Sequence, residues 1–142
     1  MLTGLGKHGP QALAVLRIVT SLLFIQHGVQ KLFGWPPSPH HPDPVPVLSL
    51  MGIGGVLELV GGLLLLLGLF TRPVAFVLAG QMAVAYWMFH FAGGMNMPHG
   101  WMPVVNGGDA AILFCFIFLY LLFAGPGTAS LDALRARPGR AD

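Results

Sequence analysis

Residues 50–70 read LMGIGGVLELVGGLLLLLGLF, and this stretch decides the class of fold. It is close to the ~20 residues that an α-helix needs to cross the hydrocarbon core of a bilayer, and Glu58 is its only charged residue. Gly54, Gly61 and Gly68 recur every seven residues and therefore share one helix face, which suits close packing between membrane helices. The stretch predicts a membrane-spanning helix packed against other helices.

Three further apolar stretches, at about residues 12–33, 73–92 and 107–124, have a similar length. Charged residues make up only 8% of the chain, against roughly 25% in soluble domains, so lipid must cover part of the surface. The sequence predicts an all-α integral membrane protein. We expect a four-helix bundle that forms a single domain over residues 1–142, with a tail at 125–142.

The basic residues predict the orientation of these spans. Lys7, Arg72 and Arg135, with Arg137 and Arg140, fall near the N-terminus, in the short 71–72 connection and in the tail. The two long connections, 34–49 and 93–106, contain neither lysine nor arginine. By the positive-inside rule both termini should be cytoplasmic, and both long loops should face outward.

Polar residues within the predicted spans gather toward the outer side. Each charge at membrane depth costs several kcal/mol, so each requires a partner or a function. Counting along the spans brings six residues from all four helices to the outer half: His27, Lys31, Glu58, His90, Asn106 and Asp109. Gln30 lies beside them, and Trp101 in the second long loop is placed to cover them. We expect these eight residues to form a ligand site.

Within this cluster Glu58 lies deepest. Either it forms an ion pair with Lys31 or His27 that only fixes the helices, or it accepts a proton during catalysis with His27. Lys31 can instead extend to the outer headgroups, and Asn106 and Asp109 can instead stabilise the start of the fourth helix. Arg17, near the cytoplasmic end, is expected to reach lipid phosphates or a helix terminus.

The composition also bears on other functions. Seven basic residues are too few and too scattered for a nucleic-acid interface. Cys115 is the only cysteine, which excludes an intrachain disulfide. Histidines and methionines on the outer side, including His40, His41 and His99, are ligand types that suit copper, but their spacing predicts no metal site.

Five motifs in order resemble those of the DoxX-like family of small bacterial membrane proteins. They are HGVQKLFG at 27–34, GVLELVGG at 55–62 with LGLFTR at 67–72, His90, NGGDAA at 106–111, and GPG at 125–127 with SLD at 130–132. The resemblance covers about residues 12–132, and Asp109 stands where the family often has glutamate. It implies a four-helix bundle in the bacterial inner membrane, often accompanied by redox proteins.

Three functions are compatible with these observations. The first is a redox-associated component, part of a quinone-linked oxidoreductase system, that binds a quinone or similar lipophilic ligand at the outer cluster. The second is a structural or assembly subunit of a larger membrane complex. Self-association into a homo-oligomer is a separate expectation, and an active homo-oligomer would argue against this second function. The third is a small-molecule permease, although no inverted repeat is visible. No electron-carrying cofactor is predicted to be bound by the chain itself.

Overall fold

The computed structural model describes residues 4–37 and 43–136, and all regular structure in these residues is helical. The elements in chain order are η1 (Leu5–His8), α1 (Gly9–Phe33), α2 (Leu50–Leu67), α3 (Thr71–Ala85), the π-helix η2 (Tyr86–Phe91), α4 (Ala92–Gly94), α5 (Pro103–Asn106), α6 (Asp109–Ala124) and α7 (Leu131–Arg135). The all-helical prediction is confirmed for the described part of the chain.

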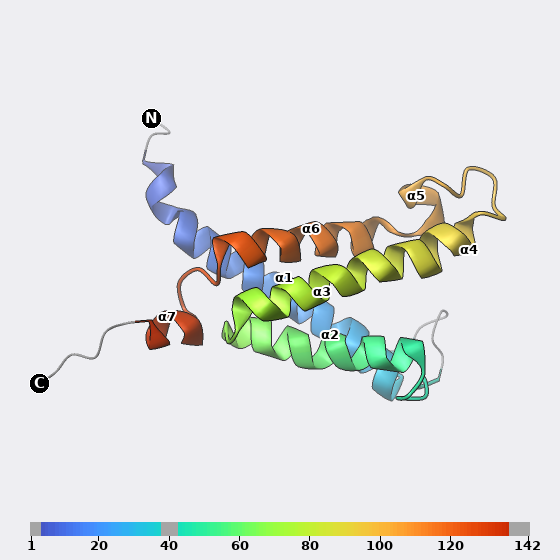
Figure 1. Cartoon of the computed structure of the whole chain (residues 1–142), viewed down its shortest axis with the longest axis horizontal. Coiled ribbons are helices and arrows are strands. Elements are labelled where there is room, and N and C mark those ends of the chain that lie inside the picture. The colour runs from blue at the N-terminus through green and yellow to red at the C-terminus, as the bar shows by residue number, and fades with distance from the viewer. Residues whose placement is uncertain (1–3, 38–42, 137–142) are drawn as a thin grey trace, which may run out of the picture.

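Three continuous helices, Leu5–Phe33, Leu50–Leu67 and Thr71–Gly94, are long and apolar enough to cross a membrane. The fourth, α6, is equally apolar but has only 16 residues. Figure 1 shows α1, α2, α3 and α6 running lengthwise beside one another. Helix α1 packs mainly along α2, and α3 packs mainly along α6.

Several helices begin or end at other residues than the predicted spans, because local capping residues set their boundaries. Helix α2 ends at Leu67 rather than near 70, because Gly68 takes the left-handed conformation (φ 63°) that ends many helices. Helix α3 begins at Thr71, two residues before Pro73. Helix α6 begins at Asp109 rather than 107, because Gly107 (φ 71°) ends the short α5.

The elements η1 and α7 and the α2–α3 turn lie at one end of the molecule, and the end of α1, the start of α2, α4 and α5 lie at the other (Figure 1). Lys7, Arg72 and Arg135 therefore belong to what we call the terminal end, and the loops belong to the opposite, loop end. This separation agrees with the charge pattern, while the side of the membrane that each end faces stays a prediction.

Arg17 holds the terminal end together. Its side chain is fully buried, and its guanidinium donates hydrogen bonds of 2.6–3.4 Å to backbone carbonyls alone. The acceptors lie at the C-terminal end of α2 and in the connection before α7: Leu65, Leu66, Pro126, Thr128 and Ala129. Of the two expected roles for Arg17, contact with a helix terminus is the one observed.

Asp132 of α7 makes a second connection at this end. The backbone N–H groups of Phe70 and Thr71 donate to its two carboxylate oxygens, at 2.9 and 2.8 Å, where α3 begins. Burial raises the pKa of Asp132, but these hydrogen bonds and the charge of Arg135 outweigh it and hold that pKa below its usual value. The ionised carboxylate thus caps α3 and explains its early start.

A glycine outside the predicted stripe of Gly54, Gly61 and Gly68 brings the backbones of α1 and α2 into contact. A Cβ atom added at Gly28 of α1 would lie 2.6 Å from the backbone nitrogen of Leu59 in α2. One added at Gly61 would lie 2.8 Å from the side chain of Leu78 in α3. The backbone contact at Gly28 leaves room for glycine alone, whereas the contact at Gly61 is with the end of a side chain.

Candidate functional site

A cavity of about 540 Å³ lies among α1, α2, α3 with its π-helical extension η2, and α6. Most of its wall is apolar and includes Phe24, Met82 and Phe114. Its polar side chains come from α1, α2, α3 and η2: His27, Lys31, Glu58, Gln81 and His90. A volume of this size, with a few convergent polar groups, is typical of sites for small molecules.

Several exposed residues of the cavity lining lie on α2 and α3, which diverge from their shared turn (Figure 1). Its rim is formed by apolar side chains that are about half exposed, among them Leu50, Ile53, Val77 and Val84. Gly80 also lines the cavity, and a Cβ atom added there would meet nothing within 4 Å. Gly107 and Ala110, at the junction of α5 and α6, are further exposed residues of the lining, so the cavity is open toward the loop end as well as along the apolar flank.

Lys31 and Glu58 form an ion pair beside this cavity. Lys31 Nζ lies 2.5 Å from Glu58 Oε1, and the two side chains are only 17% and 3% exposed. This is one of the pairings that the depth of Glu58 predicted. The other carboxylate oxygen, Oε2, is buried and receives no hydrogen bond from any of the described residues.

Gln81 is placed next to this pair. Its Nε2 donates to the carbonyl of Gly54 at 3.0 Å and lies 3.5 Å from Glu58 Oε1. Both neighbours are acceptors, so the amide must present its nitrogen to them and turn its oxygen away. That oxygen, Oε1, is a second buried acceptor without a donor in the described part of the chain.

The two histidines complete the polar lining. His90 lies in η2, and its Nδ1 is 3.2 Å from the carbonyl oxygen of Asn106. A π-helical turn inside an α-helix often marks a functional site, and here it coincides with the cavity residues Phe89 and His90. The His27 ring packs edge-on against Phe114, with 5.8 Å between ring centroids.

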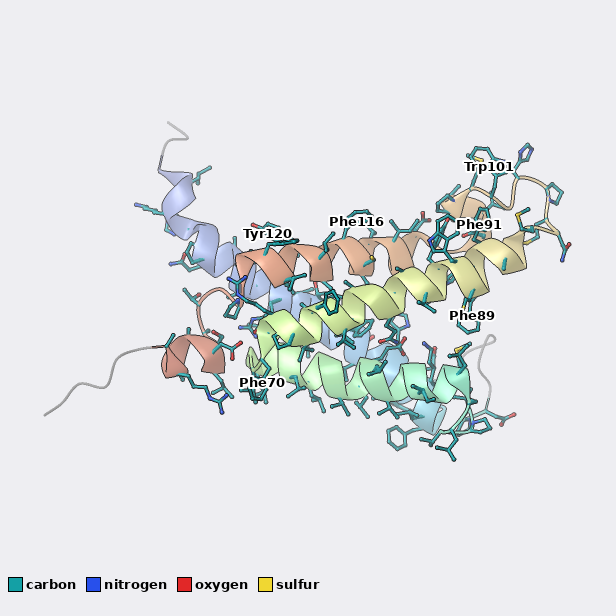
Figure 2. The ribbon with its side chains drawn as sticks, in the orientation of Figure 1. Phe70, Phe89, Phe91, Trp101, Phe116 and Tyr120 are labelled. Atoms are coloured by element: carbon teal, nitrogen blue, oxygen red, sulfur yellow. The ribbon has the colours of Figure 1, made fainter. Side chains whose placement is uncertain are left out.

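Of the eight residues predicted to form the site, His27, Lys31, Glu58 and His90 line the cavity. Gln30 lies outside and donates to the carbonyl of Pro36 at 3.0 Å. Asp109 is exposed at the first position of α6. Trp101 is 63% exposed and points away from the helices in Figure 2, so it does not cover the cluster.

The position predicted for Asn106 was wrong. It ends α5 rather than beginning α6, because Gly107 breaks the helix between them. Its side chain donates to the carbonyl of Gly100 and accepts from the N–H of Gly108, both at 2.9 Å, and so orders the loop. Its backbone carbonyl is what reaches the site, by binding His90.

Gln81 is a cavity residue that the predicted cluster omitted. Its signal in the sequence was a lone amide near the middle of an apolar helix, where polar groups are rare and need partners.

Two other features of the described residues lack the side chains of a functional site. Within residues 4–37 and 43–136, no group of three or more histidine, cysteine or acidic side chains could hold a metal ion, and His40 and His41 lie outside these ranges. A cavity of about 860 Å³ lies at the terminal end, but its described lining has no acidic, basic or histidine side chain.

Comparisons with known proteins place the chain among membrane proteins of bacteria. An uncharacterized protein of Haemophilus influenzae is 41% identical over 131 residues, covering 92% of this chain and 96% of the relative. The Escherichia coli inner membrane protein YphA is 33% identical over 138 residues, covering 89% and 92%. The E. coli inner membrane protein YqjF is 32% identical over 129 residues, covering 84% and 88%. No solved structure gives a significant match.

The family comparison agrees with the motifs found in the sequence. The DoxX family matches residues 12–91, which is more than half of the chain. With relatives that are inner membrane proteins, and with three helices able to cross a bilayer, this chain belongs to the DoxX family of membrane proteins.

Proposed function

We propose that this protein is a redox-associated membrane component that binds a quinone or a similar lipid-soluble molecule in the cavity between α2 and α3. The observation that carries the proposal is a cavity lined both by half-exposed apolar side chains of α2 and α3, which we take as its mouth, and by the buried Lys31–Glu58 pair with Gln81. A molecule dissolved in the bilayer can enter through such a mouth without passing through water. Its polar head would then meet Glu58, Lys31 and Gln81, while an isoprenoid tail stays in lipid.

The chemistry of the wall suits such a head group. Glu58 is the carboxylate placed to exchange a proton with the ligand, and His27 and His90 are placed to bind its oxygens. Lys31 holds the carboxylate in position and can stabilise negative charge that develops on the ligand. The electrons would pass to or from a partner protein through the quinone, since we assign no electron carrier to the chain itself.

The proposal includes a membrane orientation. We propose that α1, α2, the helix Thr71–Gly94 and α6 all cross the bilayer as a four-helix bundle, with the terminal end in the cytoplasm. The basic residues at that end and the absence of lysine and arginine from both loops support this orientation. The ligand would then enter from the outer half of the inner membrane.

A larger side chain at the mouth should block binding. Gly80→Leu fills space that is open in the structure, so the fold should tolerate it while the ligand is excluded. We expect decylubiquinone or decylubiquinol to bind the wild type saturably in lipid nanodiscs. For the redox form that binds the wild type more tightly, Gly80→Leu should raise the dissociation constant at least about tenfold, which is about 1.4 kcal/mol. Microscale thermophoresis with each redox form measures this.

Gly93→Leu is the matched control. Gly93 lies on the same continuous helix, has equally open space around its Cα and does not line the cavity, so this variant should bind like the wild type. The proposal fails if neither redox form binds the wild type saturably, or if Gly80→Leu binds as tightly as Gly93→Leu.

A further inference from the structure

We infer that the second long loop, residues 95–106, lies in the headgroup layer of the membrane at the loop end and binds lipid through its exposed apolar side chains. A connection between two spans is ordinarily expected in water. The inference goes beyond the proposed function, because it uses the proposed crossing of the bilayer but not the ligand of the cavity.

The surface of this loop is uncharged and largely apolar. Residues 93–106 contain no lysine, arginine, aspartate or glutamate, and His99 is their one ionisable side chain. Met95, Trp101 and Val104 are 62%, 63% and 72% exposed. Apolar side chains gathered on a surface mark a site of interaction, and tryptophan is enriched where a membrane meets water.

The helix before the loop is long enough to reach the far headgroup layer but not to leave it. Thr71–Gly94 has 24 residues, which at a rise of ~1.5 Å per residue span about 36 Å. This length exceeds the hydrocarbon core of roughly 30 Å and falls short of the roughly 40–45 Å of a whole bilayer. The basic Arg72 keeps the start of the helix at the polar boundary of the terminal end, so Gly94 ends among the headgroups of the opposite leaflet.

Beyond Gly94 the chain turns back along this helix. Gly100 packs against Gly94 so closely that a Cβ atom added at Gly100 would collide with the carbonyl oxygen of Gly94. Further along, the carbonyl oxygen of Asn106 lies 3.2 Å from His90 Nδ1. Figure 1 shows α5 beside the last turns of the helix rather than beyond its end. The loop therefore stays near the level that Gly94 reaches.

The backbone of the loop needs little water. Pro98 and Pro103 have no N–H group, and the side chain of Asn106 donates to the carbonyl of Gly100. Irregular backbone inside a membrane is costly unless its polar groups are paired within the protein. Most of the N–H groups in residues 95–108 donate to carbonyls of the same segment, and the donors are Met95, Met97, Gly100, Met102, Val105, Asn106, Gly107 and Gly108.

Asp109 limits how deep the segment lies. It is exposed at the first position of α6, directly after the loop, and a charge inside the hydrocarbon core costs several kcal/mol. The headgroup layer accommodates both this carboxylate and the apolar loop. The loop-end opening of the cavity, at Gly107 and Ala110, consequently faces lipid headgroups rather than bulk water.

Quenching of Trp101 fluorescence tests this position. Trp35→Phe and Trp87→Phe leave Trp101 as the only tryptophan of the full-length chain, which is reconstituted in phosphatidylcholine vesicles. We expect lipid brominated near the start of its acyl chains to quench Trp101 more strongly than lipid brominated near the chain middle, and more strongly than aqueous iodide. Strongest quenching by iodide would place the loop in water, and strongest quenching by the mid-chain bromines would place it in the hydrocarbon core. Quenching by none of the three would place Trp101 against protein, such as a second copy of the chain. Each of these results would overturn the inference.

Phe116→Trp, in a chain whose native tryptophans are all replaced by phenylalanine, is the matched reference. Phe116 is 63% exposed, as Trp101 is, but lies in the middle of α6. The mid-chain bromines should quench it most. If they do and Trp101 behaves otherwise than expected, the inference alone is wrong. If neither lipid quenches Phe116→Trp, the proposed crossing of α6 is wrong and the inference falls with it.

Val104→Cys provides an independent measurement in a Cys115→Ala background. Membrane fragments expose both faces of the bilayer to a membrane-impermeant maleimide, which should react with Val104→Cys several-fold more slowly than with Asp43→Cys. Both positions are exposed in the protein and lie in the loops of the same end, but Asp43 is charged and belongs to the first long loop. Equal rates at the two positions would contradict the burial of the second loop in lipid.

Discussion

Arg17→Ala is expected to destabilise the folded protein strongly. The guanidinium connects the end of α2 to the segment that follows α6, and the substitution would remove a charged donor from buried and partly buried carbonyls in both segments. Each unsatisfied buried group costs roughly 1–3 kcal/mol, so the total loss should exceed about 4 kcal/mol. The midpoint of thermal unfolding in mild detergent, followed by circular dichroism, should fall by more than about 10 °C.

Two further variants separate this account from a general effect of charge. Arg17→Lys keeps the charge but cannot span the same set of carbonyls, so its stability should lie between those of the wild type and Arg17→Ala. Arg72→Ala removes an exposed arginine that donates to the carbonyls of Leu122 and Phe123, and its effect should be much smaller. Similar losses in Arg17→Ala and Arg72→Ala would contradict the role of burial.

Lys31→Met is expected to destabilise the protein by about 3 kcal/mol, because it leaves Glu58 buried without its ion-pair partner. The aliphatic part of the side chain is kept, so the loss should reflect the charge rather than packing. Reversible unfolding by titration with sodium dodecyl sulfate, followed by circular dichroism, measures the difference in free energy of unfolding.

The double variant Lys31→Met/Glu58→Leu tests the origin of that loss. Replacing both members of a buried ion pair by apolar residues is often neutral, so the double variant should recover most of the stability lost in Lys31→Met. A double variant that is no more stable than Lys31→Met would show that the lysine stabilises the protein by some means other than the pair.

The sequence was sufficient for the helices and for part of the site. Apolar length predicted α1, α2 and α3 because lipid imposes a minimum length that needs no knowledge of neighbours. The scarcity of charge drew attention to Lys31 and Glu58, and the rule that buried charges need partners gave their contact as one of the predicted pairings of Glu58. His27 and His90 were brought into the cluster by depth along the helix alone.

The contacts that could not be predicted from the sequence join residues far apart in the chain, or residues whose type does not identify them as contact residues. The partners of Arg17 are backbone carbonyls as far as Ala129, and no side-chain pattern marks a carbonyl. Depth along a helix does not specify the direction of a side chain, so Asp109 shares the outer level but lies on the exposed surface. Gln81 carries no charge, and its role became visible only when Gly54 and Glu58 were seen to fix its amide.

The central claim is that the cavity between α2 and α3 holds a lipid-soluble molecule in the native membrane. Native mass spectrometry of the protein extracted directly from that membrane tests it most directly, with Gly80→Leu and Gly93→Leu prepared in parallel. We predict that a quinone-class molecule stays bound to the wild type and to Gly93→Leu and is lost from Gly80→Leu. Wild-type protein without such a molecule, or equal occupancy in Gly80→Leu, would contradict the claim.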